Sequence, residues 1–385
     1  MKLAVFGLAV SSSWGNGHAT LWRGLIRAMA RRGHRVVFFE RDQPWYADTR
    51  DTTELPGGTL VLYRDWEEVR ARAGRELADA DCAMVTSFCP DGVAATRLMG
   101  DANVPVRAFY DLDTPVTLAK LAAGETLPWI GPEGLGLFDL VLSYTGGAAL
   151  DALRDRLGAR DPVPLYGWAD PEVHRPVPAV ERFRADLSYL GTYAADRQAG
   201  VEALFVEPAR RRPGRRFTLA GAMYPADFPW TDNIWFVRHL PPEEHAAFLS
   251  SSRLTLNVTR EAMAAMGWCP SGRLFEAAAA GVPVVSDVWE GLDTFFRFGT
   301  EILPARTTAD VLHALELSGA ELSRIAAAAQ ARTLAEHTAD RRAAVLEGMV
   351  EAAWPGVPRK ASARNEGALG VVQAAQTLSL QAKAG

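Results

Sequence analysis

The chain has 385 residues, of which 48% are hydrophobic and 23% charged, and its formal net charge at pH 7 is −5. This length exceeds one ordinary hydrophobic core and predicts two or three domains, and the composition is typical of a soluble globular protein. The negative charge argues against a general nucleic-acid binder, because such proteins usually carry a basic surface.

The ends of the chain and its cysteines exclude two further classes. The sequence has no run of about eighteen apolar residues that would predict a membrane span. The first apolar run leads directly into a glycine-containing loop and an amphipathic helix, so we expect a first strand there and no signal peptide. Cys82, Cys89 and Cys269 are odd in number and widely separated. This pattern predicts reduced, buried thiols in a cytoplasmic protein, without a disulfide framework or a metal site.

The N-terminal half alternates predicted strands and helices, as a parallel sheet with crossover helices requires. Its predicted strands cover residues 2–10, 35–40, 59–63, 82–87, 106–110 and 138–143. The run GNGHAT at residues 15–20 resembles part of a dinucleotide-binding loop, but its G-x-G-x-x-G spacing is incomplete. A Rossmann dehydrogenase is therefore only an alternative.

His18 stands at the predicted start of the first helix, directly after the first strand and its loop. In an open α/β sheet this position faces a ligand crevice. An imidazole has an ordinary pKa near 6.5 and can accept a hydroxyl proton at neutral pH. We predict an acceptor-side role for His18; the alternative is that it caps the helix or packs against Trp22.

Two carboxylates follow the predicted strand at residues 106–110, again at the edge where ligands bind. We predict that Asp111 reaches the cleft as a base or binds sugar hydroxyls, and that Asp113 caps the next helix. Gly146 and Gly147 open a further helix, where backbone amides would be free to bind a phosphate.

A proline-rich stretch at residues 162–178 predicts an interdomain linker. We therefore divide the chain into a domain at residues 1–165, a linker at 166–186, a second domain at 187–354 and a mobile or weakly helical tail at 355–385. The second half repeats the alternation, with strands expected at residues 187–190, 216–220, 234–237, 254–258 and 282–286. Two such halves predict a bilobal α/β protein with a cleft between the lobes.

The stretch after residue 254 concentrates the polar groups of the second half. The strand at residues 254–258 ends near Arg260, Ser271 occupies a helix N-cap position, and the helix at residues 273–280 follows. Arg273 lies in the first turn of this helix, where a cation opposes the helix dipole, so a nearby anion would explain it. The alternative is an ion pair with Glu276 on the helix surface, worth only about 0.2–0.5 kcal/mol.

The run SGRLFEAAAAGVPVVSD at residues 271–287 resembles the donor-nucleotide segment of group 1 glycosyltransferases of the GT-B fold. The wider run at residues 256–296 resembles the branch that is similar to a spore-maturation protein. The resemblance implies two Rossmann-like domains facing across a cleft. It also implies that Glu276 holds the ribose hydroxyls of a nucleotide sugar and that basic residues such as Arg260 and Arg273 hold its diphosphate. Many relatives carry a second Glu eight positions earlier, where this chain has Trp268.

The family topology extends the predicted site to residues that spacing alone does not identify. It implies that Thr192 and Tyr193 approach the phosphates, that His239 lies near the base, and that Ser271 contributes at the helix start. It also makes His18 resemble the acceptor base of inverting relatives. For His239 a plain position at a helix entry is the alternative.

Together these features predict a glycosyltransferase that moves a sugar from a nucleotide-diphosphate sugar to an unidentified small-molecule or glycan acceptor. We expect no metal ion, no other cofactor and no nucleic-acid partner. An inverting reaction would use His18 or Asp111 as base, and a retaining reaction would need neither. Two alternatives are a sugar-nucleotide epimerase of the same fold and a non-catalytic nucleotide- or sugar-binding protein of a surface or spore structure.

Overall fold

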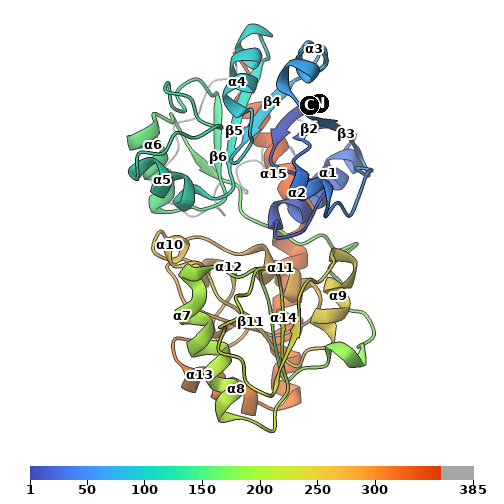
Figure 1. Ribbon diagram of the computed structural model, residues 1–385, viewed down its shortest axis with the longest axis vertical. Helices are drawn as coiled ribbons and strands as arrows, with labels where there is room; N and C mark the ends of the chain where they lie inside the picture. Colours follow the sequence, from blue (N-terminus) through green and yellow to red (C-terminus); the bar gives the residue numbers. More distant parts are fainter. Residues whose placement is uncertain (357–385) are drawn as a thin grey trace, which may run out of the picture.

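The computed structural model describes residues 1–356, which form two α/β domains (Figure 1). The N-terminal domain contains a seven-stranded sheet and the C-terminal domain a six-stranded sheet. The prediction of two Rossmann-like domains is confirmed. The predicted tail at residues 355–385 lies almost entirely outside the described residues. None of the helices in residues 1–356 combines the length and apolar character that a membrane span requires.

The N-terminal sheet is parallel throughout, with strand order β3-β2-β1-β4-β5-β6-β7. Its strands are β1 Lys2–Gly7, β2 Arg35–Arg41, β3 Gly58–Tyr63, β4 Cys82–Thr86, β5 Val106–Asp111, β6 Leu140–Ser143 and β7 Val163–Pro164. The helices of this half are α1 Gly17–Arg31, α2 Pro44–Ala47, α3 Trp66–Leu77, α4 Gly92–Asp101, α5 Thr114–Ala122 and α6 Ala148–Leu157. Helices cover both faces of the central strands, so these strands are mostly apolar; all six residues of β1 are buried, including Lys2.

The C-terminal sheet is also parallel, with order β10-β9-β8-β11-β12-β13. Its strands are β8 Leu187–Leu190, β9 Phe217–Ala220, β10 Ile234–Val237, β11 Thr255–Asn257, β12 Val284–Ser286 and β13 Leu303–Pro304. The helical segments are η1 Glu181–Phe183, η2 Ala195–Arg197, α7 Gln198–Val201, the π-helix η3 Glu202–Val206, α8 Glu207–Arg211, α9 Pro242–Ser250, α10 Glu261–Ala264, α11 Gly272–Ala279, α12 Leu292–Phe295, α13 Thr308–Glu316, α14 Gly319–Glu336 and α15 Ala339–Ala352.

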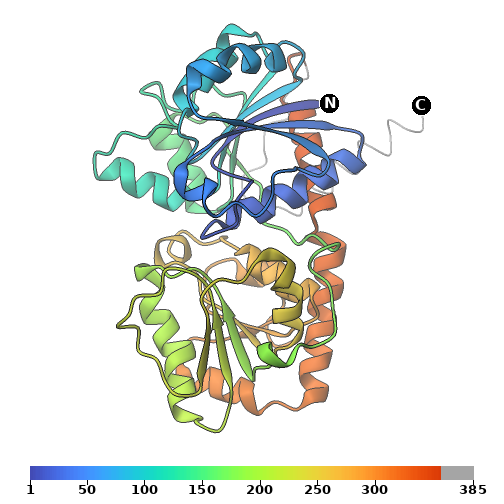
Figure 2. The ribbon, with the colours of Figure 1, turned by 45° about the vertical axis from the view of Figure 1, so that its right-hand side comes forward.

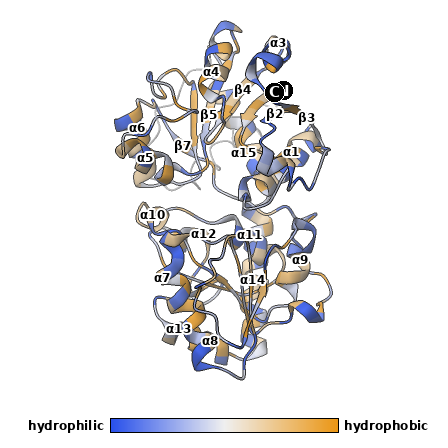
Figure 3. Cartoon of the chain, viewed as in Figure 1, coloured by the Kyte–Doolittle hydropathy of each residue, from blue (hydrophilic) through white to orange (hydrophobic). Residues whose placement is uncertain are grey.

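The strand order of the second sheet reverses between β8 and β11, and ligands of open α/β sheets bind outside such a switch point. Apolar residues concentrate along the central strands of both domains (Figure 3). The three cysteines are free and buried, as predicted.

The last helix returns to the N-terminal domain. α14 and α15 run along one side of the molecule from the lower to the upper domain (Figure 2). Ala339, Ala343, Leu346 and Val350 share one helical face and are buried in the core that contains α1 and β1. The division at residues 187–354 therefore does not describe the packing of α15, whose apolar stripe belongs to the first domain.

The carboxyl ends of the strands in the two sheets face each other across the domain boundary. The amide of Gly146, which follows β6, donates a hydrogen bond of 2.8 Å to the carbonyl of Trp268 in the C-terminal domain. Gly15, in the loop after β1, lies against Met223, in the loop after β9. Both contacts bring polar loops of one domain onto those of the other.

Candidate functional site

Arg273 lies at the switch point of the C-terminal sheet. It stands in the first turn of α11, and its Nη1 donates a 2.9 Å hydrogen bond to Oδ1 of Asn257 at the end of β11. Its guanidinium carbon lies 5.5 Å from the ring centroid of Tyr189. A Cβ added to Gly191 would lie 3.1 Å from Nη2, so the guanidinium lies directly against this glycine loop. Burial lowers the pKa of Arg273, and no carboxylate within residues 1–356 forms a salt bridge with it.

Arg197 is a second cation at this point, and the sequence interpretation missed it. Its Nη2 donates a 2.7 Å hydrogen bond to the carbonyl of Thr192, whereas its buried Nε has no partner among the described residues. After burial and the phenol of Tyr189, the positive charge of Arg197 is the next influence on Arg273 and lowers its pKa further. The charge of the Glu276 carboxylate acts on Arg273 less strongly than that of Arg197, and neither guanidinium forms a salt bridge within residues 1–356. Two such cations favour an anion between them. A basic residue six positions after Gly191, the glycine of a strand-end loop, was the signal available in the sequence.

The loop that carries Thr192 and Tyr193 is held in place by a close backbone approach. Gly221 has a φ of +156°, and a Cβ there would lie only 2.0 Å from the carbonyl oxygen of Gly191. The hydroxyl of Tyr224 donates a 3.0 Å hydrogen bond to that same oxygen. Thr192, Tyr193, Arg197 and Tyr224 line a narrow hollow beside the loop, so the two predicted residues Thr192 and Tyr193 lie next to Arg197.

Arg260 lies near this loop but is already neutralised. Its Nε donates hydrogen bonds of 2.9 and 3.2 Å to the two carboxylate oxygens of Asp196. Arg260 therefore has a carboxylate partner, whereas Arg197 forms no salt bridge within the described residues. The sequence could not indicate this, because the neutralising carboxylate is 64 positions away along the chain.

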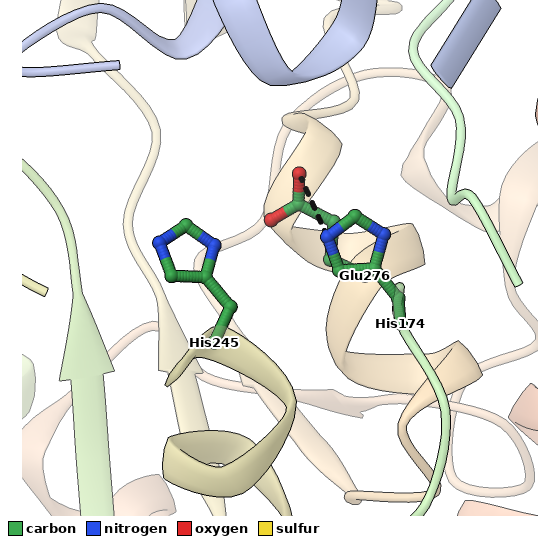
Figure 4. Close-up of side chains that lie close together, drawn as sticks. All are labelled: His174, His245 and Glu276. Carbon is green, nitrogen blue, oxygen red and sulfur yellow. Dashed lines mark ion pairs between the residues drawn. The ribbon is translucent and has the colours of Figure 1, made fainter. Parts of the chain in front are cut away.

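Glu276 lies one helical turn after Arg273 and is only 8% exposed. Its carboxylate accepts no hydrogen bond from any of residues 1–356, and burial raises its pKa. Two imidazoles converge on it, from His174 in the linker and His245 in α9 (Figure 4). A buried carboxylate without a hydrogen-bond donor is costly, so the site is complementary to a ligand that donates hydrogen bonds.

Ser271 and His239 occupy the predicted positions, at the start of α11 and after β10. Ser271 is the N-cap residue of α11, but its side chain makes no capping hydrogen bond. His239 follows β10 and is exposed. These positions leave both side chains available, and their role in binding stays a prediction.

On the facing edge of the N-terminal domain, His18 forms a pair with Asp113. His18 Nε2 lies 2.9 Å from Asp113 Oδ2, and both side chains are partly exposed. A carboxylate can only accept, so Nε2 donates and Nδ1, which has no partner among the described residues, keeps the lone pair. The contact with Asp113 fixes the orientation of the ring, and Nδ1 is buried, so a base role for His18 stays a prediction.

The structure shows neither the predicted side-chain cap by Asp113 nor the predicted cleft position of Asp111. Asp113 occupies the N-cap position of α5 but makes no side-chain cap. Asp111 is fully buried, and its Oδ1 instead accepts hydrogen bonds of 3.1 Å from the amide of Asp113 and the hydroxyl of Thr117. Burial raises the pKa of Asp111 to about 7. The strand register decides this, because β5 extends one residue further than predicted and includes Asp111.

The glycine pair before α6 contacts the other domain. The predicted amide donor Gly146 is occupied by the carbonyl of Trp268, and Gly147 has a φ of +55° and lies against the Trp268 ring. In this closed arrangement the Gly146 amide therefore holds the two domains together and does not face a phosphate.

Comparison with known proteins agrees with this geometry. Residues 197–348 match the model of a family described as glycosyl transferase-like. The matched residues cover most of the C-terminal domain. No curated protein sequence matches the chain.

Solved structures extend the similarity to both domains. Sucrose-phosphate synthase from Thermosynechococcus elongatus superimposes with a TM-score of 0.62 at 13% identity, over 91% of this chain and 98% of that one. Anabaena HepE, in complex with UDP and glucose, gives a TM-score of 0.64 at 11% identity over 91% and 99%. AviGT4, a glycosyltransferase involved in avilamycin A biosynthesis, gives 0.57 at 16% identity over 91% and 97%. The chain thus has the GT-B fold.

Proposed function

We propose that the protein is a glycosyltransferase that uses a nucleotide-diphosphate sugar as donor and transfers a hexose-type sugar. The proposal rests on two features of one site: cations that lack a salt bridge and a carboxylate that lacks a hydrogen-bond donor. Arg197 and Arg273 have no carboxylate partner, and the Glu276 carboxylate, one turn along the same helix as Arg273, has no hydrogen-bond donor within the described residues. A diphosphate satisfies the guanidinium groups and a ribose satisfies the carboxylate.

In the proposed reaction the bond between the sugar C1 and the diphosphate oxygen breaks, and a bond between C1 and the acceptor oxygen forms. The acceptor hydroxyl loses its proton, and the nucleoside diphosphate leaves with the bonding electron pair. Arg197 and Arg273 stabilise the negative charge that gathers on this leaving group, so no metal ion is needed for that task. The acceptor lies against the His18–Asp113 pair on the facing edge, and closure of the two domains positions both substrates.

Two further features support parts of the proposal. The HepE structure contains UDP, so uridine is the first nucleotide to test. The three buried free cysteines suit a reducing compartment, and we place the reaction in the cytoplasm.

The proposal is tested by calorimetric titration of UDP, ADP and GDP into wild-type protein and variants. Arg273→Gln and Arg197→Gln each remove a charged hydrogen-bond donor and should weaken binding of the preferred nucleotide about tenfold or more. Arg260→Gln is the matched control, because Asp196 already neutralises that charge, and it should change affinity by about twofold at most. Equal affinities in all four proteins would contradict the proposed pocket.

Activity is measured with the matching nucleotide sugars and a panel of sugar and aglycone acceptors. Acceptor-dependent release of nucleoside diphosphate, unchanged by EDTA, is the expected result. Conversion of the donor sugar to an epimer without any acceptor would identify an epimerase instead.

A further inference from the structure

The cluster formed by His174, His245 and Glu276 contains polar atoms that form no hydrogen bond within residues 1–356. Its three ligand-facing atoms all lie within 4.8 Å of one another. His174 Nε2 is 3.9 Å from Glu276 Oε1, which is too long for a direct hydrogen bond. His174 Nε2 and His245 Nδ1 are both buried without a partner among residues 1–356. Figure 4 shows the carboxylate and the two rings directed into the same space.

The hydrogen-bond partners of the two rings determine where their hydrogens lie. The backbone amide of Asp170 donates a 3.1 Å hydrogen bond to His174 Nδ1. His174 Nδ1 is therefore an acceptor, and in the neutral ring Nε2 carries the hydrogen. His245 Nε2 lies 3.2 Å from the carbonyl of Leu240, which can only accept, so Nε2 carries the hydrogen and Nδ1 keeps the lone pair.

The space between the three side chains is thus lined by one donor and three acceptors. The donor is His174 Nε2–H, and the acceptors are His245 Nδ1 and the two oxygens of Glu276. A metal ion does not fit, since it would require a lone pair on His174 Nε2. A phosphate does not fit either, because it would face the carboxylate. A hydroxyl group does fit, because it can accept from His174 and donate to Glu276, and a neighbouring hydroxyl can donate to His245.

We propose that His174 and His245 complete, with Glu276, a recognition site for a vicinal diol, and that this diol is the 2′,3′-diol of the donor ribose. The inference deepens the proposed function and rests on it. It assigns the two histidines as specificity-determining residues that favour ribonucleotides over deoxyribonucleotides. Loss of one hydroxyl leaves a buried polar group of the protein unpaired, which is the larger part of the expected penalty.

The inference is tested by combining changes in the ligand with changes in the protein. Calorimetry measures the affinity of UDP, 2′-deoxy-UDP and 3′-deoxy-UDP for wild type and for His174→Leu and His245→Leu. Wild type should bind UDP about tenfold or more tightly than either deoxy analogue. Each leucine variant should reduce at least one of these two ratios to within about twofold of unity.

Conservative variants and an exposed histidine serve as controls. His174→Gln keeps an N–H group near the Nε2 position, and His245→Asn keeps an acceptor near the Nδ1 position, so both should retain most of the discrimination. His313→Leu, at an exposed position in α13, should retain all of it. Because the readout is a ratio of affinities in one protein, a general loss of stability does not imitate the effect.

Three results would overturn the inference, and they are distinct from failure of the proposed function. If wild type bound 2′-deoxy-UDP or dTDP as tightly as UDP, the protein would not recognise the ribose diol. Unchanged ratios in both leucine variants would exclude the histidines. Binding of zinc ions that His174→Leu and His245→Leu abolish would identify a metal site. If UDP, ADP and GDP all fail to bind wild type, or Arg273→Gln leaves binding unchanged, the proposed function itself fails.

Discussion

At the scale of single residues, Asp111 shows how burial decides the chemistry of a carboxyl group. Its Oδ1 accepts two hydrogen bonds, whereas its buried Oδ2 has no partner among residues 1–356. Desolvation is the largest cause of its raised pKa, and hydrogen bonds from Asp113 and Thr117 oppose it. A group in this state anchors the loop after β5 and does not meet a substrate.

Asp111 should therefore make stability depend on pH. Its pKa is about 7 in the folded chain and about 3.9 in an unfolded one, so the folded state binds the additional proton between these values. The contribution of Asp111 to stability is fully present below about pH 4 and is lost as the pH rises through 7. Asp111→Asn should gain on the order of 2 kcal/mol relative to wild type between pH 4 and pH 8, measured by urea unfolding. A constant difference across this range would contradict the assignment.

In contrast to Asp111, we expect His18 and Asp113 to affect turnover, because their contact lies at the domain boundary. If this pair removes the proton from the hydroxyl group of the acceptor substrate, His18→Ala should lower turnover about 100-fold or more. The same variant should leave UDP affinity within about twofold of wild type. Asp113→Asn should lower turnover in the same direction, because the ring loses the partner that orients it. Asp111→Asn is the matched control and should retain wild-type turnover.

The anomeric configuration of the product, measured by NMR, tests whether the His18–Asp113 pair acts as a base. Unchanged turnover in His18→Ala together with a retained configuration would remove the base role, since a retaining reaction needs no acceptor base.

At the scale of elements, the glycines between strands and helices shape the donor loop. Gly221 allows the loops after β8 and β9 to touch, and no other residue fits its backbone position without moving Gly191. Gly221→Ala should displace the Thr192 loop and the Arg197 contact with it. We expect a loss of about 2–3 kcal/mol in the free energy of unfolding and at least a tenfold loss of UDP affinity. Both are measurable by chemical denaturation and calorimetry.

Gly214→Ala is the control for this prediction, because a Cβ there meets nothing within 4 Å. It should leave stability within about 0.5 kcal/mol and UDP affinity within about twofold of wild type. If both glycine variants behaved alike, the close approach of the two loops would not support the donor site.

The same elements show what the sequence could predict. Apolar runs ending at polar residues located nearly every strand, and β8 and β10 have the predicted bounds. β7 was not predicted, because two residues that include a proline have no periodicity. Contacts between distant elements were also beyond reach. The Asp113 partner of His18 is 95 positions away, and the two histidines beside Glu276 come from the linker and α9.

At the scale of the whole molecule, two connections relate the domains. In the first, the linker and the start of α15 lie side by side where Ala169 and Thr338 form a parallel bridge. Nearby, the buried Nε of Arg342 donates a 3.0 Å hydrogen bond to the carbonyl of Tyr166. The apolar stripe of α15 predicts that one face of the helix is buried, but it does not predict which domain that face packs against. Because α15 packs on the first domain, the chain crosses between the domains twice, at two adjacent places.

The second connection is the contact between Gly146–Gly147 and Trp268 across the domain boundary. Gly147 has φ +55° and ψ −135°, a conformation that favours glycine, and a Cβ there would lie 2.8 Å from both Met266 O and the Trp268 ring. Gly147→Ala should therefore loosen the closed arrangement. We expect a larger radius of gyration in small-angle scattering and a turnover lower by about tenfold, because closure positions the acceptor against the donor.

UDP affinity should stay within about twofold in Gly147→Ala, since Arg197, Arg273 and Glu276 all belong to the C-terminal domain. Gly100→Ala, in the same domain as Gly147 and with no atom within 4 Å of the added Cβ, should match wild type in every measurement. A Gly147→Ala protein as compact and as active as wild type would show that the Trp268 contact does not control closure. A parallel loss of UDP affinity would instead place the donor site between the domains, because a site confined to one domain cannot sense the position of the other.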